Sequence, residues 1–203
     1  MIIYLIRHGQ IDNPKKIFYG RSLDLLLSTE GKNQIVDLAK KINTIGDRIE
    51  RIYTSPLKRA LDTSKILSRD LKSHPDISIN QDLIDVYIPA LVGQNLKLRK
   101  TIHQSGNDEY GQKYTRLGNE SRSHIVKRMT DAFKTIVDNS KCNVIAIVSH
   151  GDPIRFLLYK LTHSYTKFIP PMNKLVKSDY LEKGRAFKLI VDKSVNLKEV
   201  KMI

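Results

Sequence analysis

The sequence lacks the features that several classes of protein require. Its 203 residues include a single cysteine, Cys142, so an internal disulfide is excluded and no cysteine-based metal cluster is expected. No apolar run approaches the ~20 residues that a membrane-spanning helix needs. The apolar stretch at the start is too short for a secretion signal and has no cationic segment before it. We therefore expect a cytoplasmic protein with no membrane association, no metal and no other cofactor.

Acidic residues are scarce relative to basic ones. The chain has 21 acidic and 35 basic residues, which gives a net charge of +14. This surplus has three interpretations: long-range steering of anionic substrates, a nucleic-acid surface, or a lysine-rich solvated surface. The basic residues are scattered, with no long run and few aromatic residues among them. Nucleic acid is therefore the weakest interpretation, and a solvated surface is the first.

The patterning of the chain is that of a single α/β domain covering residues 1–203. Hydrophobic residues make up 40% and charged residues 28% of the chain, as in ordinary globular proteins. Apolar strand-like runs alternate with stretches of helical spacing, which predicts a mostly parallel central sheet with helices on both faces. Expected strands are 2–6, 51–54, 77–79 and 144–148, with 185–191 and 197–202 as a peripheral antiparallel pair. Expected helices begin at Ser28, Ser55-Pro56, near Ile125 and at Asp152-Pro153.

The first strand organises the rest of the chain. Ile2 to Ile6 form a continuous apolar run, typical of a central buried strand in a parallel sheet. The run ends in Arg7, His8 and Gly9. Because ligands of open α/β sheets bind just beyond the carboxyl ends of the strands, we expect a cation and an imidazole at that edge. By itself, such a tripeptide is more often a polar start of a loop.

A second apolar run ends in the same way. Val144 to Val148 are followed by Ser149, His150 and Gly151. Two facing imidazoles with a nearby arginine suit the binding and transfer of a phosphoryl group. A helix beginning just after His150 would add backbone N–H groups for an anion.

Three segments carry a resemblance to a known family. Arg7 to Gly9 and Ser149 to Gly151 resemble the histidine phosphatase superfamily, specifically its phosphoglycerate-mutase-like branch. Ser55 to Thr63 is similar to the family segment S-x-L-x-R-A-x-x-T. The resemblance implies that His8 is a nucleophile that forms phosphohistidine. It also implies that Arg7, Arg59 and His150 surround the transferred phosphoryl group, with Gly151 in the same substrate site.

The loop after the first strand supplies further candidates. Its end resembles the family segment G-x-x-x-D-x-P-L-T-x-x-G-x-x-Q, and the matching residues are Gly20, Asp24, Leu27, Gly31 and Gln34. Asn13 and Arg21 can donate hydrogen bonds to phosphate oxygens, and with Gly20 they are predicted to bind substrate. For both side chains the alternative is an exposed loop residue. The family pattern is R-H-G-x-T-x-x-N. In this sequence Ile11 stands in place of the threonine and Pro14 in place of the asparagine, so Asn13 lies one position before the family's asparagine.

The expected proton donor departs from the family pattern. Leu83 to Asp85 resembles the segment in which a glutamate donates the proton, but Asp85 stands in the glutamate's place. Its side chain is one methylene shorter, and the carboxyl must still reach the leaving-group oxygen. Asp82 is an alternative donor, and a plain loop carboxylate is the other interpretation.

The stretch 87–117 has poor periodicity and is interrupted by glycines. Thirty residues without structure are unusual in a compact domain, so we interpret it as a partly helical cap inserted over the site. Gly118 to Ser121 resembles the family segment G-E-S. Glu120 is interpreted as an acid at the start of the next helix rather than as a catalyst.

Taken together, the sequence predicts a metal-independent phosphatase that hydrolyses phosphomonoesters through phosphohistidine on His8. Its partner would be a small phosphorylated substrate, and the sequence is compatible with a homodimer. The alternatives are a phosphoglycerate mutase, which returns the phosphoryl group to a hydroxyl, and a non-catalytic phosphate-binding module. The natural substrate is not specified by the sequence.

Overall fold

Six strands form one sheet in the order β3-β2-β4-β1-β5-β6. The computed structural model describes residues 1–21, 25–164, 166, 168–175, 180–192 and 194–203. The strands are β1 (Ile2–Arg7), β2 (Arg51–Thr54), β3 (Asp76–Ile79), β4 (Val144–Ser149), β5 (Ala186–Val191) and β6 (Leu197–Met202). The first four are mutually parallel, whereas β5 and β6 are antiparallel additions. The predicted α/β class with a mostly parallel sheet is confirmed.

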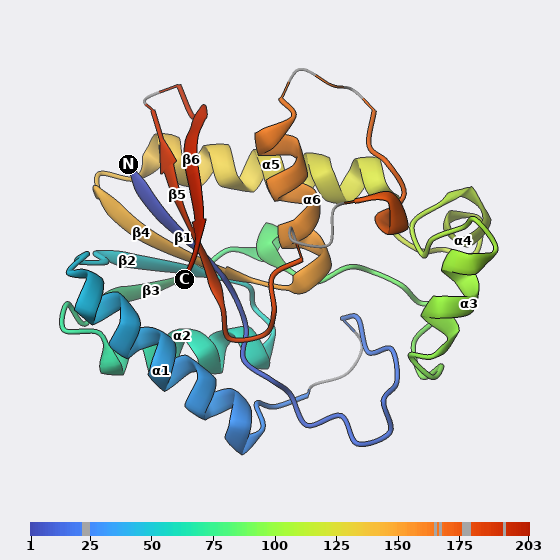
Figure 1. Ribbon diagram of the computed structural model, residues 1–203, viewed down its shortest axis with the longest axis horizontal. Coiled ribbons are helices and arrows are strands. Elements are labelled where there is room, and N and C mark those ends of the chain that lie inside the picture. Colours follow the sequence, from blue (N-terminus) through green and yellow to red (C-terminus); the bar gives the residue numbers. More distant parts are fainter. Residues whose placement is uncertain (22–24, 165, 167, 176–179, 193) are drawn as a thin grey trace.

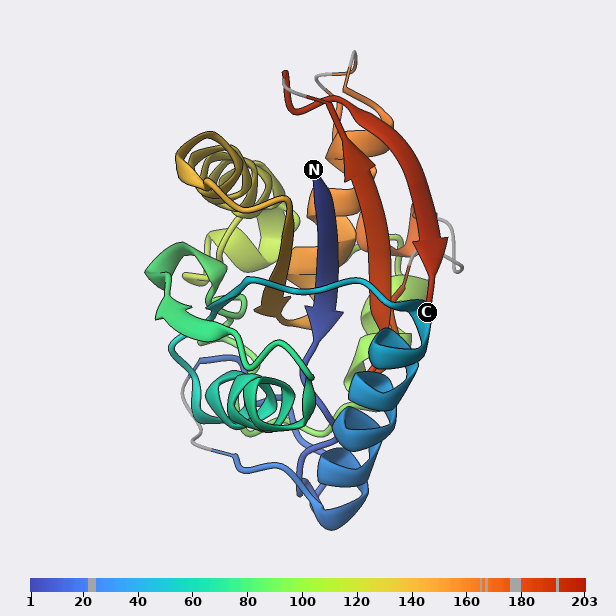
Figure 2. The same ribbon diagram turned by 90° about the vertical axis from the view of Figure 1, so that its left-hand side faces the viewer.

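Strand β1 lies inside the sheet, with β4 on one side and β5 on the other (Figure 2). Its register with β4 pairs Arg7 with Ser149. The two strands therefore end at the same level, and the residues that follow them, His8 and His150, emerge side by side. The C-terminal pair is antiparallel as predicted, but β5 bonds directly to β1, so only β6 is peripheral.

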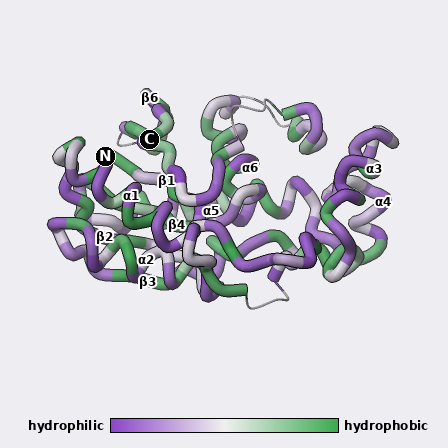
Figure 3. The backbone as a smooth tube through the Cα atoms, turned by 60° about the horizontal axis from the view of Figure 1, so that its bottom comes forward, coloured by the Kyte–Doolittle hydropathy of each residue, from purple (hydrophilic) through white to green (hydrophobic). Residues whose placement is uncertain are grey.

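Helices cover both faces of the sheet (Figure 1). Helices α1 (Thr29–Ile45) and α2 (Lys58–Asp70) lie on one face, and α5 (Arg122–Asn139) and α6 (Gly151–Thr162) on the other. Side chains of β1 alternate between the two cores: Tyr4 and Ile6 pack on the α1 side, Ile3 and Leu5 on the α5 side. Along the helices, hydrophobic and hydrophilic stretches alternate (Figure 3), as expected for elements with one face on a sheet.

Of the four predicted helix starts, those at Ser28 and near Ile125 agree with α1 and α5, whereas those at Ser55-Pro56 and at Asp152-Pro153 are wrong. The Ser28 hydroxyl accepts from the Gly31 N–H at 3.0 Å and caps α1 as expected. Helix α2 begins at Lys58 instead of Pro56, with Leu57 as its N-cap, because the first helical N–H groups, those of Ala60 and Leu61, donate to the Leu57 carbonyl. The Ser55 hydroxyl accepts the Leu57 N–H at 3.4 Å and bonds the His150 ring at 2.8 Å. Helix α6 begins at Gly151, before the expected cap.

In α6, a tertiary contact uses the side chain that was expected to cap the helix. The N-cap of α6 is His150, and Asp152 lies within the first turn. The Asp152 carboxylate accepts hydrogen bonds from Arg99 and Tyr110. Because both donors come from residues 87–117, the carboxylate connects that stretch to α6 and does not cap the helix.

The stretch 87–117 is partly helical. It contains α3 (Leu98–Gln104) and the short α4 (Gln112–Thr115), both distant from the sheet in Figure 1. It follows the 3-10 turn η1 (Gln81–Leu83); a second such turn, η2 (Met172–Lys174), lies after α6. The Gly93 N–H donates to the Phe18 carbonyl at 2.9 Å, which joins the stretch to the loop after β1. Its role as a cap stays a prediction. No helix among the described residues is both long and apolar enough to span a bilayer.

Candidate active site

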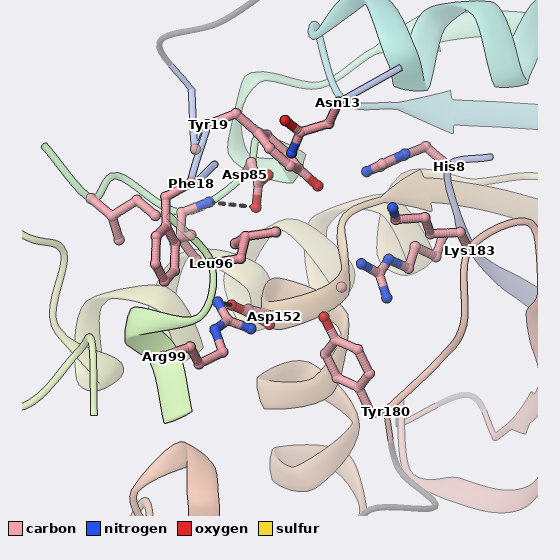
Figure 4. A pocket seen from close by; sticks show the side chains of 15 residues that line it. His8, Asn13, Phe18, Tyr19, Asp85, Leu96, Arg99, Asp152, Tyr180 and Lys183 are labelled. Carbon is pink, nitrogen blue, oxygen red and sulfur yellow. Dashed lines mark hydrogen bonds and ion pairs between the residues drawn. The ribbon is translucent and has the colours of Figure 1, made fainter. Parts of the chain in front are cut away.

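A cavity of about 190 Å³ opens beyond the carboxyl ends of β1 and β4 (Figure 4). Several segments that are far apart in the sequence contribute to it. Its lining comprises Arg7, His8, Asn13, Phe18, Tyr19, Gly20, Asp85, Val86, Ile88, Leu96, Arg99, Gly151, Asp152, Tyr180 and Lys183. The edge of the sheet that the sequence indicated therefore holds a cavity with both charged and apolar walls.

His8 is held as a neutral imidazole with a defined tautomer. Its Nδ1 lies 2.8 Å from the carbonyl oxygen of Gly9. A carbonyl can only accept, so Nδ1 carries the proton and Nε2 keeps a free lone pair. Burial, together with the charges of Arg59 and Arg7, lowers the pKa of His8 well below its usual value. Near neutral pH the neutral imidazole is therefore favoured, with the lone pair of Nε2 unprotonated.

His150 has the opposite tautomer. The Arg59 Nε donates to His150 Nδ1 at 3.3 Å, so Nε2 carries the proton and donates to the Ser55 hydroxyl at 2.8 Å. Burial and the charge of Arg59 hold the pKa of His150 well below its usual value. The two imidazole centroids, of His8 and His150, are 5.1 Å apart. His150 is buried beside His8 and is not part of the cavity lining.

Arg7 is held against the start of α6. Its Nη1 donates to the carbonyl of Leu181 at 2.8 Å, and its guanidinium lies 4.8 Å from the centre of the Tyr180 ring. A Cβ at position 151 would lie 2.7 Å from Arg7 Cζ and 2.9 Å from the Tyr180 hydroxyl. Only glycine at position 151 leaves room for this arginine.

Arg59 enters the site from the first turn of α2. Its side chain is almost completely buried, and its Nη2 donates to the Asp85 carboxylate at 2.7 Å and to the Gly20 carbonyl at 2.9 Å. These acceptors compensate a cation placed at the unfavourable end of a helix. Arg59 does not line the cavity; it lies behind Asp85 and touches the ring of His150.

Asp85, and not Asp82, reaches the cavity. Asp82 is exposed, whereas Asp85 is 7% exposed and lines the cavity. One carboxylate oxygen of Asp85 accepts the Val86 N–H at 2.8 Å, and the other lies 3.6 Å from His150 Nδ1. Burial raises the pKa of Asp85 above its usual value, although the charge of Arg59 offsets part of the rise. A carboxyl that holds its proton near the cavity can donate it to a leaving group.

The loop after β1 contributes Asn13 and Gly20 but not Arg21. Asn13 lines the cavity while its amide group pairs with the backbone N–H and carbonyl of Ile17. Gly20 lines the cavity with a positive φ of 44°. Arg21 is turned away: its Nε donates to the Asp85 carbonyl at 2.6 Å and its Nη2 to Glu120 at 2.9 Å. Asp24 lies outside the described residues.

Several residues that line the cavity were not among the predicted site residues. Tyr19 and Phe18 lie in the loop after β1, whereas Tyr180 and Lys183 follow α6, in a part of the chain without a family motif. Burial and the charge of Arg7 lower the pKa of Lys183. In Figure 4, Lys183 lies beside His8, and Tyr180 lies across the cavity from Tyr19. No sequence signal identified these residues.

A buried polar network joins the stretch 87–117 to α6. The Arg99 Nη2 donates to Asp152 at 3.1 Å, and the Tyr110 hydroxyl donates to the same carboxylate oxygen. Arg99 also forms a 2.6 Å ion pair with Glu109. Burial alone would raise the pKa of Asp152, but Arg99 and Tyr110 bring it below its usual value. Asp152 is therefore ionised and offsets the charge of Arg99.

The arrangement suits an anion that reacts at His8. The positive charges of Arg7, Arg59 and Lys183 all lower the pKa of His8. Arginine and lysine side chains are common ligands of phosphate oxygens. Within the described residues, no group of three or more His, Cys, Asp or Glu side chains could hold a metal ion.

Comparisons with known proteins agree with this geometry. The sequence matches the model of the histidine phosphatase superfamily (branch 1) over residues 3–190. A broad-specificity phosphatase of Saccharomyces cerevisiae is 26% identical over 193 residues, covering 91% of this chain and 82% of the yeast protein.

The chain is also similar to a mutase in sequence and to a solved structure in fold. A 2,3-bisphosphoglycerate-dependent phosphoglycerate mutase of Thermoplasma acidophilum is 29% identical over 155 residues, covering 76% of this chain and 72% of the mutase. The solved structure of YhfR from Bacillus stearothermophilus superposes with a TM-score of 0.79 at 21% identity, covering 97% of this chain and 94% of YhfR.

Proposed function

The chain belongs to the histidine phosphatase superfamily (branch 1), and we propose that it hydrolyses small phosphomonoesters through a phosphohistidine on His8. The observation that carries this proposal is the state of His8. Its pKa is lowered, its Nδ1–H is occupied by the Gly9 carbonyl, and the ring lines a cavity among cationic side chains. Its Nε2 is thereby available to attack phosphorus.

In the first step, Nε2 of His8 attacks the phosphorus of the bound ester. The N–P bond forms as the P–O bond to the leaving group breaks, and the departing alkoxide takes the proton of Asp85. The raised pKa of Asp85 supports this role. Arg7, which lines the cavity, stabilises the charge that develops on the phosphoryl oxygens, and the buried charge of Arg59 adds to this from behind Asp85. His150 donates to these oxygens once its Nε2–H leaves Ser55.

In the second step, water replaces the alcohol. The Asp85 carboxylate takes a proton from the water as its oxygen bonds to phosphorus. The N–P bond breaks, its electrons return to His8, and inorganic phosphate leaves. The net reaction is ester plus water to alcohol plus phosphate. The positive charge that the transfer requires is supplied by Arg7, Arg59 and Lys183, so the proposed reaction uses no metal ion.

The test is phosphate release from a panel of phosphomonoesters, without added metal and with a chelator present. Wild type and His8→Ala are compared, and both are checked for folding by circular dichroism. We expect release by the wild type and loss of release in the variant. Release by the variant would contradict the role of His8, and inhibition by the chelator would contradict the metal-independent reaction.

A mutase is the second candidate, because one relative is a phosphoglycerate mutase. The same panel includes 3-phosphoglycerate, with its isomer quantified. Isomer formation without phosphate release would favour the mutase. If neither occurs while phosphate analogues still bind, the cavity belongs to a non-catalytic binding module.

A further inference from the structure

A buried carboxylate outside the cavity, that of Glu120, joins several segments near Asp85. The side chain of Glu120 is 3% exposed. It accepts hydrogen bonds from Arg21 Nη2 at 2.9 Å, Arg128 Nε at 3.0 Å and the Tyr87 N–H at 3.1 Å. Ser121 is the N-cap of α5, so Glu120 lies before the helix and is not the helix-start acid expected from the sequence.

The two arginines bound to Glu120 hold the backbone around Asp85. Arg21 Nε donates to the carbonyl of Asp85 itself at 2.6 Å. Arg128 Nη1 donates to the carbonyl of Ile84 at 2.9 Å and also to the carbonyl of Asp82. The main chain on both sides of the Asp85 carboxyl is therefore held by groups that meet at Glu120.

A direct backbone pairing completes this arrangement. The Glu120 N–H donates to the Tyr87 carbonyl at 2.7 Å, while its carboxylate accepts the Tyr87 N–H. Residues 82 to 87 are thus connected to the segment before α5 by both main-chain and side-chain hydrogen bonds. These hydrogen bonds lie outside the cavity, because Glu120, Arg21 and Arg128 do not line it.

We propose that Glu120 is a positioning residue that acts through Arg21 and Arg128 to place the carboxyl of Asp85 at the leaving-group oxygen. The inference rests on the proposed function. An aspartate has one methylene fewer than a glutamate, so its carboxyl follows the main chain closely. The short side chain of Asp85 can serve as the proton donor only if the backbone beneath it is held in place.

Charge explains why a carboxylate is needed at this point. Burial alone would raise the pKa of Glu120. The pKa is nevertheless below its usual value, because Arg128 and the Tyr87 N–H donate hydrogen bonds to the carboxylate and because Arg128 and Arg21 are positively charged. Burial lowers the pKa of Arg21, and the charge of Arg128 adds to that effect. Without the anion between them, the two guanidinium groups would repel each other.

The test compares two substrates that differ in their need for a proton. An alkyl phosphate releases a basic alkoxide and requires general-acid assistance, whereas 4-nitrophenyl phosphate releases a stable phenolate. The ratio of their kcat/KM values reports the placement of Asp85, because kcat/KM includes the departure of the leaving group. Loss of folded protein lowers both values equally and leaves the ratio unchanged.

For Glu120→Gln we expect kcat/KM for the alkyl phosphate to fall by about 10²-fold, within the range of general-acid contributions. For 4-nitrophenyl phosphate we expect a fall of less than about tenfold. Arg21→Gln removes the hydrogen bond to the Asp85 carbonyl, and the side chain that it replaces is partly exposed. This variant should also lower the ratio of the alkyl-phosphate value to the 4-nitrophenyl phosphate value. It also keeps the proposal testable if Glu120→Gln fails to fold.

The two variants change the local charge in opposite directions. If Glu120 and Arg21 acted only through charge, the basic limb of the alkyl-phosphate pH profile would shift in opposite directions in the two variants. At a fixed pH on that limb, the ratio would then fall in Glu120→Gln and rise in Arg21→Gln, whereas a positioning role lowers the ratio in both variants. His124→Asn is the matched control. His124 also bonds the Glu120 carboxylate, at 2.8 Å, but its side chain is 65% exposed and it makes no tie to the Asp85 segment, so the ratio should not change.

The outcomes separate this inference from the function on which it rests. A lowered ratio in Arg21→Gln, and in Glu120→Gln where that variant folds, with His124→Asn like the wild type, supports the positioning role. A raised ratio in Arg21→Gln overturns it. An active wild type with an unchanged ratio in every folded variant overturns the positioning role alone. A wild type that releases no phosphate from either substrate overturns the proposed function and this inference together.

Discussion

At the scale of single residues, neighbours set the proton positions on the two central imidazoles. A carbonyl acceptor, that of Gly9, holds the proton of His8 on Nδ1, and an arginine donor, Arg59, holds that of His150 on Nε2. Both rings are buried beside cations, so both favour the neutral form. The residue types alone do not give this result, because an isolated histidine pair titrates near pH 6.5.

The pH dependence of the reaction follows from these shifts. The first step of the proposed reaction needs His8 neutral, which holds above its lowered pKa, and Asp85 protonated, which holds below its raised pKa. We expect kcat/KM for an alkyl phosphate to have a basic limb, on which it falls as pH rises and Asp85 loses its proton. Stopped assays from pH 4 to 9 measure this. Asp85→Asn should lose the basic limb, and a wild-type rate that climbs steadily to pH 8 would contradict the assignment.

A second residue-scale prediction concerns Gly151. A Cβ there would meet Arg7 Cζ at 2.7 Å, so Gly151→Ala must displace the guanidinium. We expect kcat/KM to fall by about 10²–10³-fold, the usual effect of losing one donor to the developing charge.

The matched control for this variant is Gly46→Ala. A Cβ at Gly46 meets nothing within 4 Å, but its φ of 86° favours glycine. It should cost about 1–2 kcal/mol of stability with kcat/KM unchanged. Equal kcat/KM losses in the two alanine variants would mean that space beside Arg7 is unimportant.

At the scale of elements, the stretch 87–117 is joined to α6 through one carboxylate. Tyr110 is buried, and its hydroxyl bonds Asp152, which lies in the first turn of α6 and lines the cavity. Arg99 bonds the same oxygen from α3. The position of this stretch relative to the cavity therefore depends on a buried polar network, and such networks are costly to leave incomplete.

Tyr110→Phe tests this connection. Removing the hydroxyl takes one of the two donors from the buried, ionised oxygen of Asp152 and leaves only Arg99, so we expect the free energy of unfolding to fall by about 1–3 kcal/mol. Chemical denaturation followed by circular dichroism measures the change. Tyr114→Phe, whose hydroxyl has no hydrogen-bond partner in the described part of the chain, should change stability by less than about 0.5 kcal/mol. Similar values for the two variants would argue against a network centred on Asp152.

At the scale of the whole molecule, the net charge of +14 is the property that the fold explains least. The cavity adds its own cations, Arg7, Arg99 and Lys183, with Arg59 buried behind Asp85. A positive molecule with a cationic cavity should attract phosphomonoesters at long range. That attraction weakens once the Debye length falls to about 10 Å, near 0.1 M salt.

Salt dependence measures this attraction. We expect kcat/KM to fall several-fold between about 0.01 and 0.5 M sodium chloride, with kcat nearly constant, because screening acts on encounter and not on the bound complex. A kcat/KM that does not change with salt would favour the alternative that the surplus charge is only a solvated surface. Retention on DNA at low salt, lost as salt rises, would revive the nucleic-acid interpretation.

Local sequence determined the framework of this protein. Apolar runs such as Ile2 to Ile6 and Val144 to Val148 predict buried parallel strands, because a strand covered on both faces needs apolar side chains at every position. Residues that directly follow those strands, His8 and His150, had to meet once the strands paired. The Ser28 cap of α1 was also predictable, since a cap uses only its own helix.

Only the tertiary structure decided how the remaining polar groups are used. Ser55 and Asp152 have the residue types of helix caps, but residues of distant segments, His150 and Arg99, also bond their side-chain oxygens. Arg21 suited a phosphate ligand by type, yet Glu120 and the Asp85 carbonyl bind it. Tyr180 and Lys183 reach the cavity from a part of the chain with no motif. The physical reason is that hydrogen bonds and ion pairs depend on distances between segments far apart in sequence, which no local pattern encodes.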